Sequence, residues 1–443
     1  MARVSRLAVL AMLCGAGVGS SLVACNALTG VSSLGTCTDD CAALMAGSEG
    51  GSGSEGGVGS EGGTPGVDAG PQLPLTCTGN ETACAGTTLG QCMNGMWLKT
   101  TCPELCLNGK CDSWPSCRNA AGTGCGVGAG TSCCETALVP GGMFSRRNGF
   151  GGLTNATVSP FALDKYEVTV GRMRAFVDAG GGVQATAPAL GAGANPHIAG
   201  SGWHTEWNVF LPANGTTLRT SFAKANGTWT DAPGAHEHLP INNVSWFVAS
   251  AFCAWDGGRL PTYAELNFAG AGGSEQRQYP WSSSPNDNTI TISRAAYNCA
   301  YTAPAKNCPS SYCSDSSSTP CDTTTCVSPA SCVYPSCTGC AFSDIAPVGA
   351  LPTGAGKWGH FDLSGNVAEL VVDVDGLLML PCMDCARLPP VNVHGPQGNP
   401  RLDTNFLVVA GSWDGTAASL HTSSFTTTKD DLVDSGIGFR CVR

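Results

Sequence analysis

Cysteine is the residue type in this sequence that offers the most chemistry, since 26 of the 443 residues are cysteines. Cys382 and Cys385 form a Cys-x-x-Cys pair with Met379 nearby, and such soft sulfur ligands could hold Cu(I) in a reducing setting. Cys102 and Cys106 have a spacing that zinc ligands also use, but no histidine lies near them. In both places we predict disulfides rather than metal sites, because oxidised pairs are the default in an exported chain.

The distribution of the cysteines along the chain agrees with this prediction. Cys14 belongs to the N-terminal export signal and Cys25 is a candidate lipidation site, which leaves an even number. Most of these fall into local groups with even counts, and the two isolated ones, Cys253 and Cys441, could pair with each other. The groups are Cys37 with Cys41, six from Cys77 to Cys111, four from Cys117 to Cys134, eight from Cys299 to Cys340, and Cys382 with Cys385.

Residues 1–25 have the features of a bacterial lipoprotein signal peptide. Arg3 and Arg6 form a cationic start, an apolar run follows, and Leu22-Val-Ala-Cys25 resembles a lipoprotein cleavage box. We therefore predict that Cys25 becomes the first mature residue and carries acyl chains that hold the exported protein on a membrane, at the outer membrane or cell surface. The alternative is a transmembrane helix, but the apolar run is shorter than the about 20 residues that a span needs.

Charge and composition describe the next parts of the chain. The formal net charge of −11 argues against nucleic acid as a partner, because phosphates require a basic surface. Residues 26–75 contain a Gly/Ser/Glu-rich stretch that cannot bury enough apolar surface to fold, so we predict a flexible, disordered tether. Residues 76–135 are rich in cysteine and too few to build a large core, so we predict a region that disulfides stabilise.

Short elements must position the chemistry of the remaining chain. Residues 161–168 alternate between apolar and polar side chains like a strand. Thr169 is placed to cap a helix, Ser245 to cap a second one, and Thr262 with Glu265 to form the capping box of a third. The spacing of the second helix predicts a buried face made of Trp246, Ala249, Phe252 and Cys253.

Several ordered segments of the sequence carry a resemblance to a known family. They are Pro140-Gly-Gly-Met-Phe144, Glu167-Val-Thr169, Pro240 to Trp246, Arg259 to Leu266, Gly365 to Glu369, and Gly438 to Val442. In this order they resemble the formylglycine-generating enzyme, or sulfatase-modifying factor, family. The resemblance implies a loop-rich α+β domain with a C-type-lectin-like fold over residues 136–443, in which residues 299–340 are a Cys-rich insertion.

The resemblance also implies two structural features. Family members have a disulfide whose positions map onto Cys253 and Cys441. They bind structural calcium at the Gly-Asn-x-x-Glu loop, where oxygen ligands suit a hard cation. The alternative for this loop is a capped turn with solvated acids. The implied calcium ligands are the carboxylates of Asp362 and Glu369 and the backbone oxygens of Gly365 and Val367.

The catalytic part of the family pattern is absent from this sequence. Active members hold Cu(I) between two cysteines that follow a Gly-Gly-Ser strand, and they oxidise a cysteine of a bound sulfatase to formylglycine. Gly415 and Leu420 occupy those two positions here, and residues such as His421 and Thr422 replace arginines that are frequent nearby. The resemblance therefore argues against copper and against this oxidase activity.

We predict a membrane-anchored envelope lipoprotein whose domain has kept the fold and lost the oxidase centre. Such a domain would bind a protein or glycan of the envelope, or play a structural role. Trp203 and Trp207, in a long loop, could stack on sugars or peptides, or else cover the core of the domain. The alternative function is a formylglycine-generating oxidase with relocated metal ligands, for which Cys382 and Cys385 are the candidates.

Overall fold

The computed structural model describes residues 73–118 with short gaps, 123–146, 154–283, 289–302, 340–376, 381–394, 400–429 and 432–443. The predicted signal peptide with Cys25, nearly all of the tether and most of the 299–340 insertion lie outside the described residues. Among the residues that are described, no helix has both the length and the hydropathy to span a membrane.

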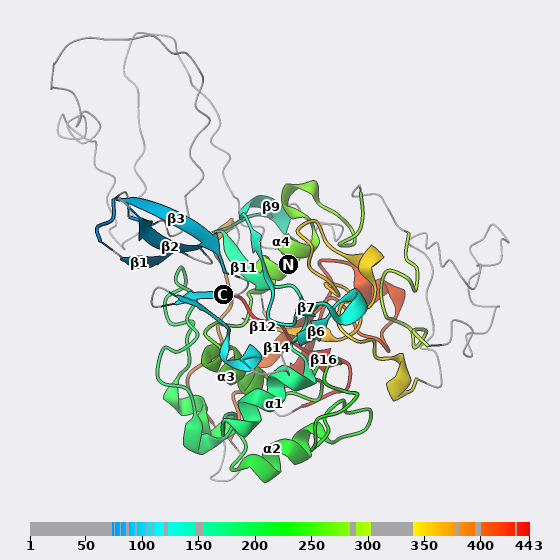
Figure 1. The fold of residues 1–443 in the computed structure, drawn as a ribbon. Helices are drawn as coiled ribbons and strands as arrows, with labels where there is room; N and C mark the ends of the chain where they lie inside the picture. The colour runs from blue at the N-terminus through cyan, green and yellow to red at the C-terminus, as the bar shows by residue number, and fades with distance from the viewer. Residues whose placement is uncertain are drawn as a thin grey trace, which may run out of the picture. The chain divides into compact units, whose positions relative to one another are not determined.

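The described strands are short and form several small sheets (Figure 1). They are β1 (Thr82–Ala85), β2 (Thr88–Met93), β3 (Met96–Thr101), β4 (Leu105–Leu107), β5 (Lys110–Asp112), β6 (Thr123–Cys125), β7 (Thr131–Ser132), β8 (Thr136–Val139), β9 (Gly142–Arg146), β10 (Thr154–Val158), β11 (Phe161–Asp164), β12 (Ala368–Val374), β13 (Cys382–Met383), β14 (Asn405–Val409), β15 (Phe425–Lys429) and β16 (Ile437–Gly438). Their orders are β1-β2-β3, β13-β10-β9, β11-β8, β15-β14-β12-β16, β4-β5 and β6-β7.

The described α-helices are α1 (Val170–Asp178), α2 (Gly215–Phe222), α3 (Trp246–Trp255) and α4 (Tyr263–Gly270). Three of them begin at the predicted caps: the side chains of Thr169, Ser245 and Thr262 each accept a backbone N–H of the first turn. Glu265 completes the capping box of α4, which confirms that prediction. The fourth helix, α2, was not predicted; the side chain of Asn214 caps it.

The sheet β15-β14-β12-β16 separates two apolar cores, because side chains alternate between the faces of a strand. From β12, Leu370 and Val372 face one core while Val371 faces the other. From β14, Phe406 and Val408 join the first core, and Leu407 and Val409 join the second. Helices α1 and α3 pack in the first core and α4 packs in the second, so the sheet has helices on both faces.

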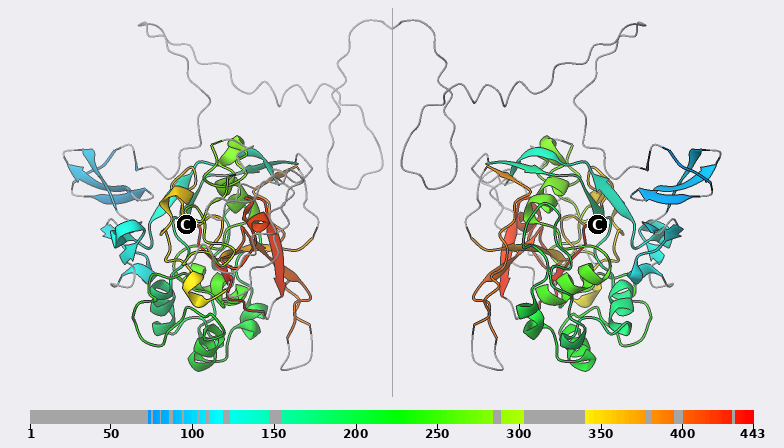
Figure 2. Two further views of the ribbon diagram at one scale, coloured as in Figure 1. Left: turned by 90° about the vertical axis from the view of Figure 1, so that its right-hand side faces the viewer. Right: turned by 90° about the vertical axis from the view of Figure 1, so that its left-hand side faces the viewer.

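Helix α3 is attached to the sheet by its predicted apolar face. The indole nitrogen of Trp246 donates to the carbonyl of Val371 at 2.8 Å, and its ring stacks on Phe406 at 4.7 Å between centroids. Figures 1 and 2 show α1, α2 and α3 gathered on one side of the sheet, away from α4. Ala249, Phe252 and Cys253 are fully buried, which confirms the predicted face of this helix.

Trp203 and Trp207 are only 1% and 2% exposed and pack in the first core, so of the two roles considered for them they have the second, that of covering the core. The prediction of one strand needs correction. The predicted strand 161–168 ends at Asp164. The chain changes its backbone partner beyond this point, since Asp164 is the last residue in register with β8 and the N–H of Val168 donates to the carbonyl of Phe439 at 2.8 Å. The buried Asp164 carboxylate pairs with the guanidinium of Arg172 at 2.8 Å.

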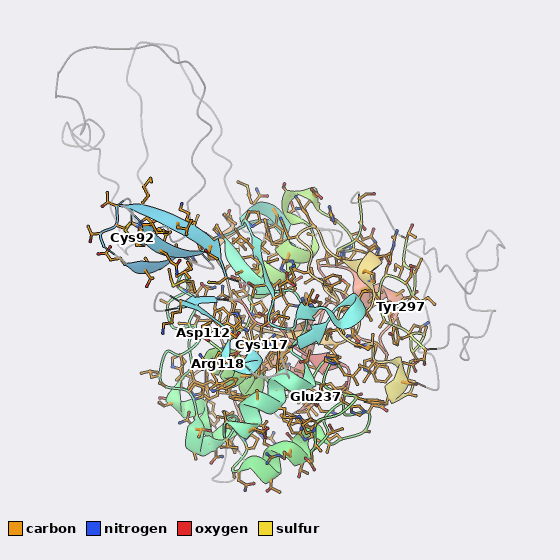
Figure 3. The ribbon with its side chains drawn as sticks, viewed as in Figure 1. Cys92, Asp112, Cys117, Arg118, Glu237 and Tyr297 are labelled. Carbon is orange, nitrogen blue, oxygen red and sulfur yellow. A yellow bond between two sulfur atoms is a disulfide. The ribbon has the colours of Figure 1, made fainter. Side chains whose placement is uncertain are left out.

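The Cys-rich region before the domain is crosslinked within the predicted groups. The described disulfides are Cys77–Cys92, Cys84–Cys106, Cys117–Cys134 and Cys125–Cys133, and Cys102 is also disulfide-bonded. The region contacts the domain through Ser116, whose backbone and hydroxyl both donate to Asp256 at 2.8 Å. The buried Arg172 and the terminal Arg443 bind the same carboxylate. Figure 3 marks Cys117, Asp112 and Arg118 of this region.

Candidate functional site

The loop after β14 carries the two positions at which the family pattern expects copper ligands. Gly415 closes a turn, since its N–H donates to the carbonyl of Ser412 at 2.9 Å. A Cβ at Gly415 would lie 2.9 Å from the hydroxyl oxygen of Ser419 and 3.1 Å from backbone atoms of Ser412. Both distances are shorter than an ordinary van der Waals contact, so a side chain at this position would require the Ser419 hydroxyl to rotate and the loop to shift by a few tenths of an ångström.

Leu420 lies at the end of the short 3-10 helix Ala417–Leu420 and is fully buried. Its side chain fills an apolar cluster with Ala417 and two ring-bearing residues, Tyr279 and Tyr297, the latter marked in Figure 3. Trp281 stacks on Tyr279 at 5.3 Å and packs at the edge of the same cluster. A leucine in this place offers no lone pair to a metal, and its neighbours are apolar or aromatic.

His421 and Ser423 are the polar groups next to this cluster. Burial lowers the pKa of His421 to about 4, so its ring is neutral at pH 7. Its Nδ1 atom lies 2.9 Å from the hydroxyl of Ser423 and accepts the Ser423 N–H at 3.2 Å. The ring meets Tyr279 edge to face at 6.1 Å between centroids. These contacts hold the imidazole against the apolar cluster.

Every cysteine whose side chain the structure describes is in a disulfide. Cys299 comes close to the loop, because its N–H donates to the carbonyl of Trp413 at 2.8 Å, but its sulfur is bonded to Cys340. Cys382 and Cys385 are bonded to each other, as predicted. The described part of the chain therefore presents no thiolate that could replace the missing pair at positions 415 and 420.

The predicted calcium loop is a tight left-handed turn. Gly365 has φ of +90° and Asn366 has φ of +63°. A Cβ at Gly365 would stand 2.6 Å from the carbonyl oxygen of Ala296, so glycine is required for this close approach. The Asn366 carbonyl accepts the N–H of Trp413 at 2.7 Å, which joins this turn to the loop of Gly415.

Glu369, a predicted calcium ligand, is paired with an arginine. Arg440 donates to both carboxylate oxygens of Glu369 at distances from 2.7 to 2.9 Å, and both side chains are buried. The remaining donors of Arg440 bind the backbone carbonyls of Asp164, Lys165 and Phe361. Sequence reasoning missed this arginine, although it lies in the Gly-Phe-Arg-Cys segment.

Two more buried carboxylates lie beside this ion pair. Glu167 accepts the side-chain amide of Asn366 at 2.7 Å and the N–H of Val367 at 3.0 Å, and burial raises its pKa well above the usual range, with Asp362 adding to the effect. Asp362 accepts the N–H of Gly349 at 2.6 Å, and burial raises its pKa to about 6. Arg440 opposes both shifts by its positive charge.

These contacts do not fit a calcium shell made of the four predicted ligands. Calcium takes six to eight oxygen ligands, and carboxylates supply most of its charge compensation. Both carboxylate oxygens of Glu369 accept hydrogen bonds from Arg440. The guanidinium therefore already provides the positive charge that a calcium ion beside Glu369 would provide. Asp362, Gly365 and Val367 remain near the loop, and the calcium prediction stays a prediction.

One other group of described side chains has the residue types of a metal site. Ligand atoms of Cys125, Cys133 and His238 all lie within 4.8 Å of one another. The two cysteines are bonded to each other, so neither sulfur is a thiolate. This group therefore has only the imidazole to offer a metal in the structure.

A pocket of about 430 Å³ lies away from the loop of Gly415 and Leu420. Arg259 and Glu265 line it as a bidentate ion pair, with N–O distances of 2.8 and 2.6 Å, and His197 is exposed at its rim. A neighbouring hollow of about 280 Å³ shares Ala192 and Ala254 with it. Both hollows are concave surfaces on the described part of the chain that could receive a ligand.

The fold and the site together define a class of protein: a loop-rich α+β domain closed by a disulfide between helix α3 and its last segment. The structure forms this bond between Cys253 and Cys441, the pair that the resemblance implies. A family model described as sulfatase-modifying factor enzyme 1-like domain matches residues 128–443. The chain belongs to this family, which confirms the resemblance and the fold class.

Curated relatives include both active and inactive proteins by name. The chain is 29% identical over 166 residues to the formylglycine-generating enzyme of Thermomonospora curvata, covering 32% of this chain and 50% of that protein. It is 32% identical over 164 residues to the mouse inactive C-alpha-formylglycine-generating enzyme 2, covering 32% and 49%. The chain thus spans about half the length of the curated relatives it matches. PvdO from Pseudomonas aeruginosa aligns over 70% of this chain and 94% of that one, with a TM-score of 0.38 and 17% identity.

Proposed function

We propose that this chain is a cell-envelope lipoprotein whose formylglycine-generating-enzyme-like domain is not catalytic, and that it binds a protein or glycan or has a structural role. The observation that carries the proposal is the loop after β14. A side chain at Gly415 would press on Ser412 and Ser419, and Leu420 fills an apolar cluster where the family's chemistry requires thiolates. Names of relatives do not decide the matter, since both active and inactive ones match.

The alternative is a copper-dependent oxidase that makes formylglycine with relocated ligands. Among the described cysteines, Cys299 with Cys340 near the loop and Cys382 with Cys385 are the candidates, and both pairs are disulfides. An oxidised pair has no thiolate to bind Cu(I), so this activity would require the reduced form of one of them.

Incubation with copper and a substrate peptide separates the two functions. Full-length protein, with and without prior treatment with a mild thiol reductant, is mixed with Cu(I) and a Cys-x-Pro-x-Arg peptide, and the peptide is weighed by mass spectrometry. We expect no conversion, while the Streptomyces coelicolor formylglycine-generating enzyme, a relative at 32% identity, serves as the positive control. Replacement of the peptide thiol by an aldehyde in the sample with our protein would overturn the proposal.

The binding role is tested on the pocket beside α3. We expect a glycan array or a set of purified envelope proteins to give a signal that Ala254→Trp, which fills the space shared by the two hollows, abolishes. The matched control is Ala223→Trp at the end of α2, which is exposed and outside both hollows. If the wild-type protein binds nothing in either screen, the binding role is refuted and only the structural role remains.

Lipidation is tested at Cys25, a residue outside the described part of the chain. We expect full-length protein expressed in a diderm bacterium to fractionate with membranes and to carry acyl chains on Cys25 by mass spectrometry. Cys25→Ser should move the protein to the soluble fraction, because the acyl chains on Cys25 are the proposed membrane anchor. Membrane retention of that variant would contradict the lipoprotein assignment.

A further inference from the structure

The disulfide Cys382–Cys385 lies at the edge of the sheet β13-β10-β9, where its surroundings hold it in place. Met383 pairs with Thr157 of β10 in parallel register. The carboxylate between the two cysteines, Asp384, accepts the N–H of Ser159 at 2.6 Å and the Ser159 hydroxyl at 2.8 Å. Both cysteines also pack against the second core of the domain.

Exposure distinguishes this disulfide from the others that are described. Cys382 and Cys385 are both partly exposed, whereas in each of the other described disulfides at least one cysteine is buried. Cys253 and Cys441, for example, are fully buried. Thiol–disulfide exchange requires an attacking thiolate to approach a sulfur atom, so accessibility decides which disulfides can react.

A buried arginine contacts one of the two sulfur atoms. Arg146 is 2% exposed and donates a hydrogen bond from its guanidinium to Cys385 Sγ at 3.3 Å. The guanidinium also lies 3.6 Å from the carboxylate of Asp373 and over the ring of Tyr263. An arginine next to a cysteine lowers the thiol pKa and stabilises the thiolate, so Cys385 is the better leaving group of the pair.

From the accessible Cys-x-x-Cys disulfide and the guanidinium on Cys385, we propose that Cys382–Cys385 is a redox-active site for thiol–disulfide exchange with cysteine thiols of a protein or peptide. This inference is independent of the proposed function. A substrate thiolate attacks Cys382 Sγ, the S–S bond to Cys385 breaks, and Cys385 leaves as a thiolate beside Arg146 while a mixed disulfide forms at Cys382.

The second half of the exchange completes a two-electron transfer. A second thiolate of the same substrate attacks the mixed disulfide, which forms the substrate disulfide and releases Cys382 as a thiolate. The substrate dithiol loses two electrons and two protons, and the cysteine pair gains two electrons and takes up protons from solvent. The reduced pair returns to the disulfide by the same steps in reverse, with another disulfide-containing molecule as the oxidant.

Selective reduction of the native protein tests the site without any variant. Full-length protein is held in reduced glutathione at graded concentrations, quenched with an alkylating reagent and digested, and each cysteine peptide is weighed. We expect the peptide of Cys382 and Cys385 to carry two alkyl groups at reductant levels that leave Cys253–Cys441 intact. Reduction of this pair no earlier than the buried pairs would overturn the proposal.

The role of Arg146 in stabilising the Cys385 thiolate is tested by the redox potential of the pair. In Arg146→Gln the equilibrium constant for reduction by glutathione should fall about tenfold, because the Cys385 thiolate loses a charge-assisted hydrogen bond. Arg146→Lys should restore most of it, and the exposed Arg387→Gln, nearby in the chain, should leave it unchanged. An equal constant in Arg146→Gln and Arg387→Gln would remove the arginine from the mechanism. If Arg146→Gln does not fold, the redox potential of Arg146→Lys still tests the contribution of the arginine, and the reduction assay on the native protein still tests the redox activity of the pair.

Exchange itself is tested with a reduced synthetic peptide that contains two cysteines. We expect one equivalent of peptide disulfide to form per protein, with loss of the Cys382–Cys385 bond. The Cys382→Ala/Cys385→Ala variant should form none, while its other disulfides stay intact. Peptide oxidation at the same yield by that variant would contradict the assignment.

Discussion

Arg440 compensates more than one buried acid, and this gives a prediction at the scale of single residues. Arg440→Gln leaves Glu369 buried without its cation, and Asp362 and Glu167 lose the same nearby charge. Removal of one partner of a buried pair costs about 3–5 kcal/mol. We expect the free energy of unfolding to fall by that amount in denaturant titrations.

The control for this variant is an exposed ion pair of similar composition. Arg219 and Asp178 lie 3.7 Å apart with side chains 40% and 64% exposed. Because water screens such a pair, Arg219→Gln should change the free energy of unfolding by less than about 0.5 kcal/mol. Similar losses in the two arginine variants would mean that burial of the Arg440 pair does not matter.

Asp362 gives a prediction about pH. Burial raises its pKa from 3.8 to about 6, so the folded protein holds this proton more tightly than the unfolded chain does. Its contribution to stability is complete below pH 3.8 and is lost as the pH rises through 6. Asp362→Asn removes this titration and keeps an oxygen for the N–H of Gly349. The variant should therefore lose less stability between pH 4 and pH 7 than the native protein, by on the order of 2–3 kcal/mol.

The same variant tests the calcium prediction. A bound cation would lower the pKa of Asp362 and raise the melting temperature of the native protein when calcium is added. Because the Glu369 carboxylate is already paired with Arg440, we expect added calcium to leave the melting temperatures of the native and the Asp362→Asn protein unchanged at pH 7. A rise that only the native protein shows would establish Asp362 as a ligand.

At the scale of elements, the cap of α4 is a specific prediction. Thr262→Ala removes the side chain that accepts the N–H of Glu265, and it leaves the first turn of a buried helix without that partner. Loss of an N-cap typically costs about 0.5–2 kcal/mol, which would be measured as a lower free energy of unfolding in denaturant titrations. Thr220→Ala, an exposed threonine inside α2, is the matched control and should change stability by less than about 0.5 kcal/mol. Equal effects would mean that the cap is not what stabilises α4.

Elements whose signal is local could be predicted from the sequence. The caps at Thr169, Ser245 and Thr262 depend on residues a few positions apart, and all three helices begin where expected. Helix α2 has a cap at Asn214 and an apolar pair at Leu218 and Phe222, but it is short and rich in threonine, so its periodicity is weak. The combination of Asn214 as a possible N-cap with the i, i+4 pair of Leu218 and Phe222 is the sequence signal that could have predicted α2.

At the scale of the whole molecule, partners far apart in the sequence were the harder part of the prediction. The residues at the two positions where the resemblance expects cysteines, Gly415 and Leu420, can be read directly from the sequence. The pairing of Arg440 with Glu369, which are 71 positions apart, cannot, because no local pattern marks an arginine as buried. The apolar environment of Leu420 was hidden for the same reason, since its neighbours come from residues 279 to 297.

The disulfide Cys253–Cys441 joins α3 to the last segment of the chain across a separation of 188 residues. Closure of so long a loop lowers the conformational entropy of the unfolded chain. Such a disulfide typically contributes about 2–5 kcal/mol to the free energy of unfolding. Cys253→Ala/Cys441→Ala should therefore lower the free energy of unfolding by that amount without reductant. The matched control is Cys382→Ala/Cys385→Ala, whose separation is 3 residues and whose chain-entropy contribution is much smaller. If both variants lose the same stability, loop closure is not the source, and the lost packing of buried sulfur must be measured instead.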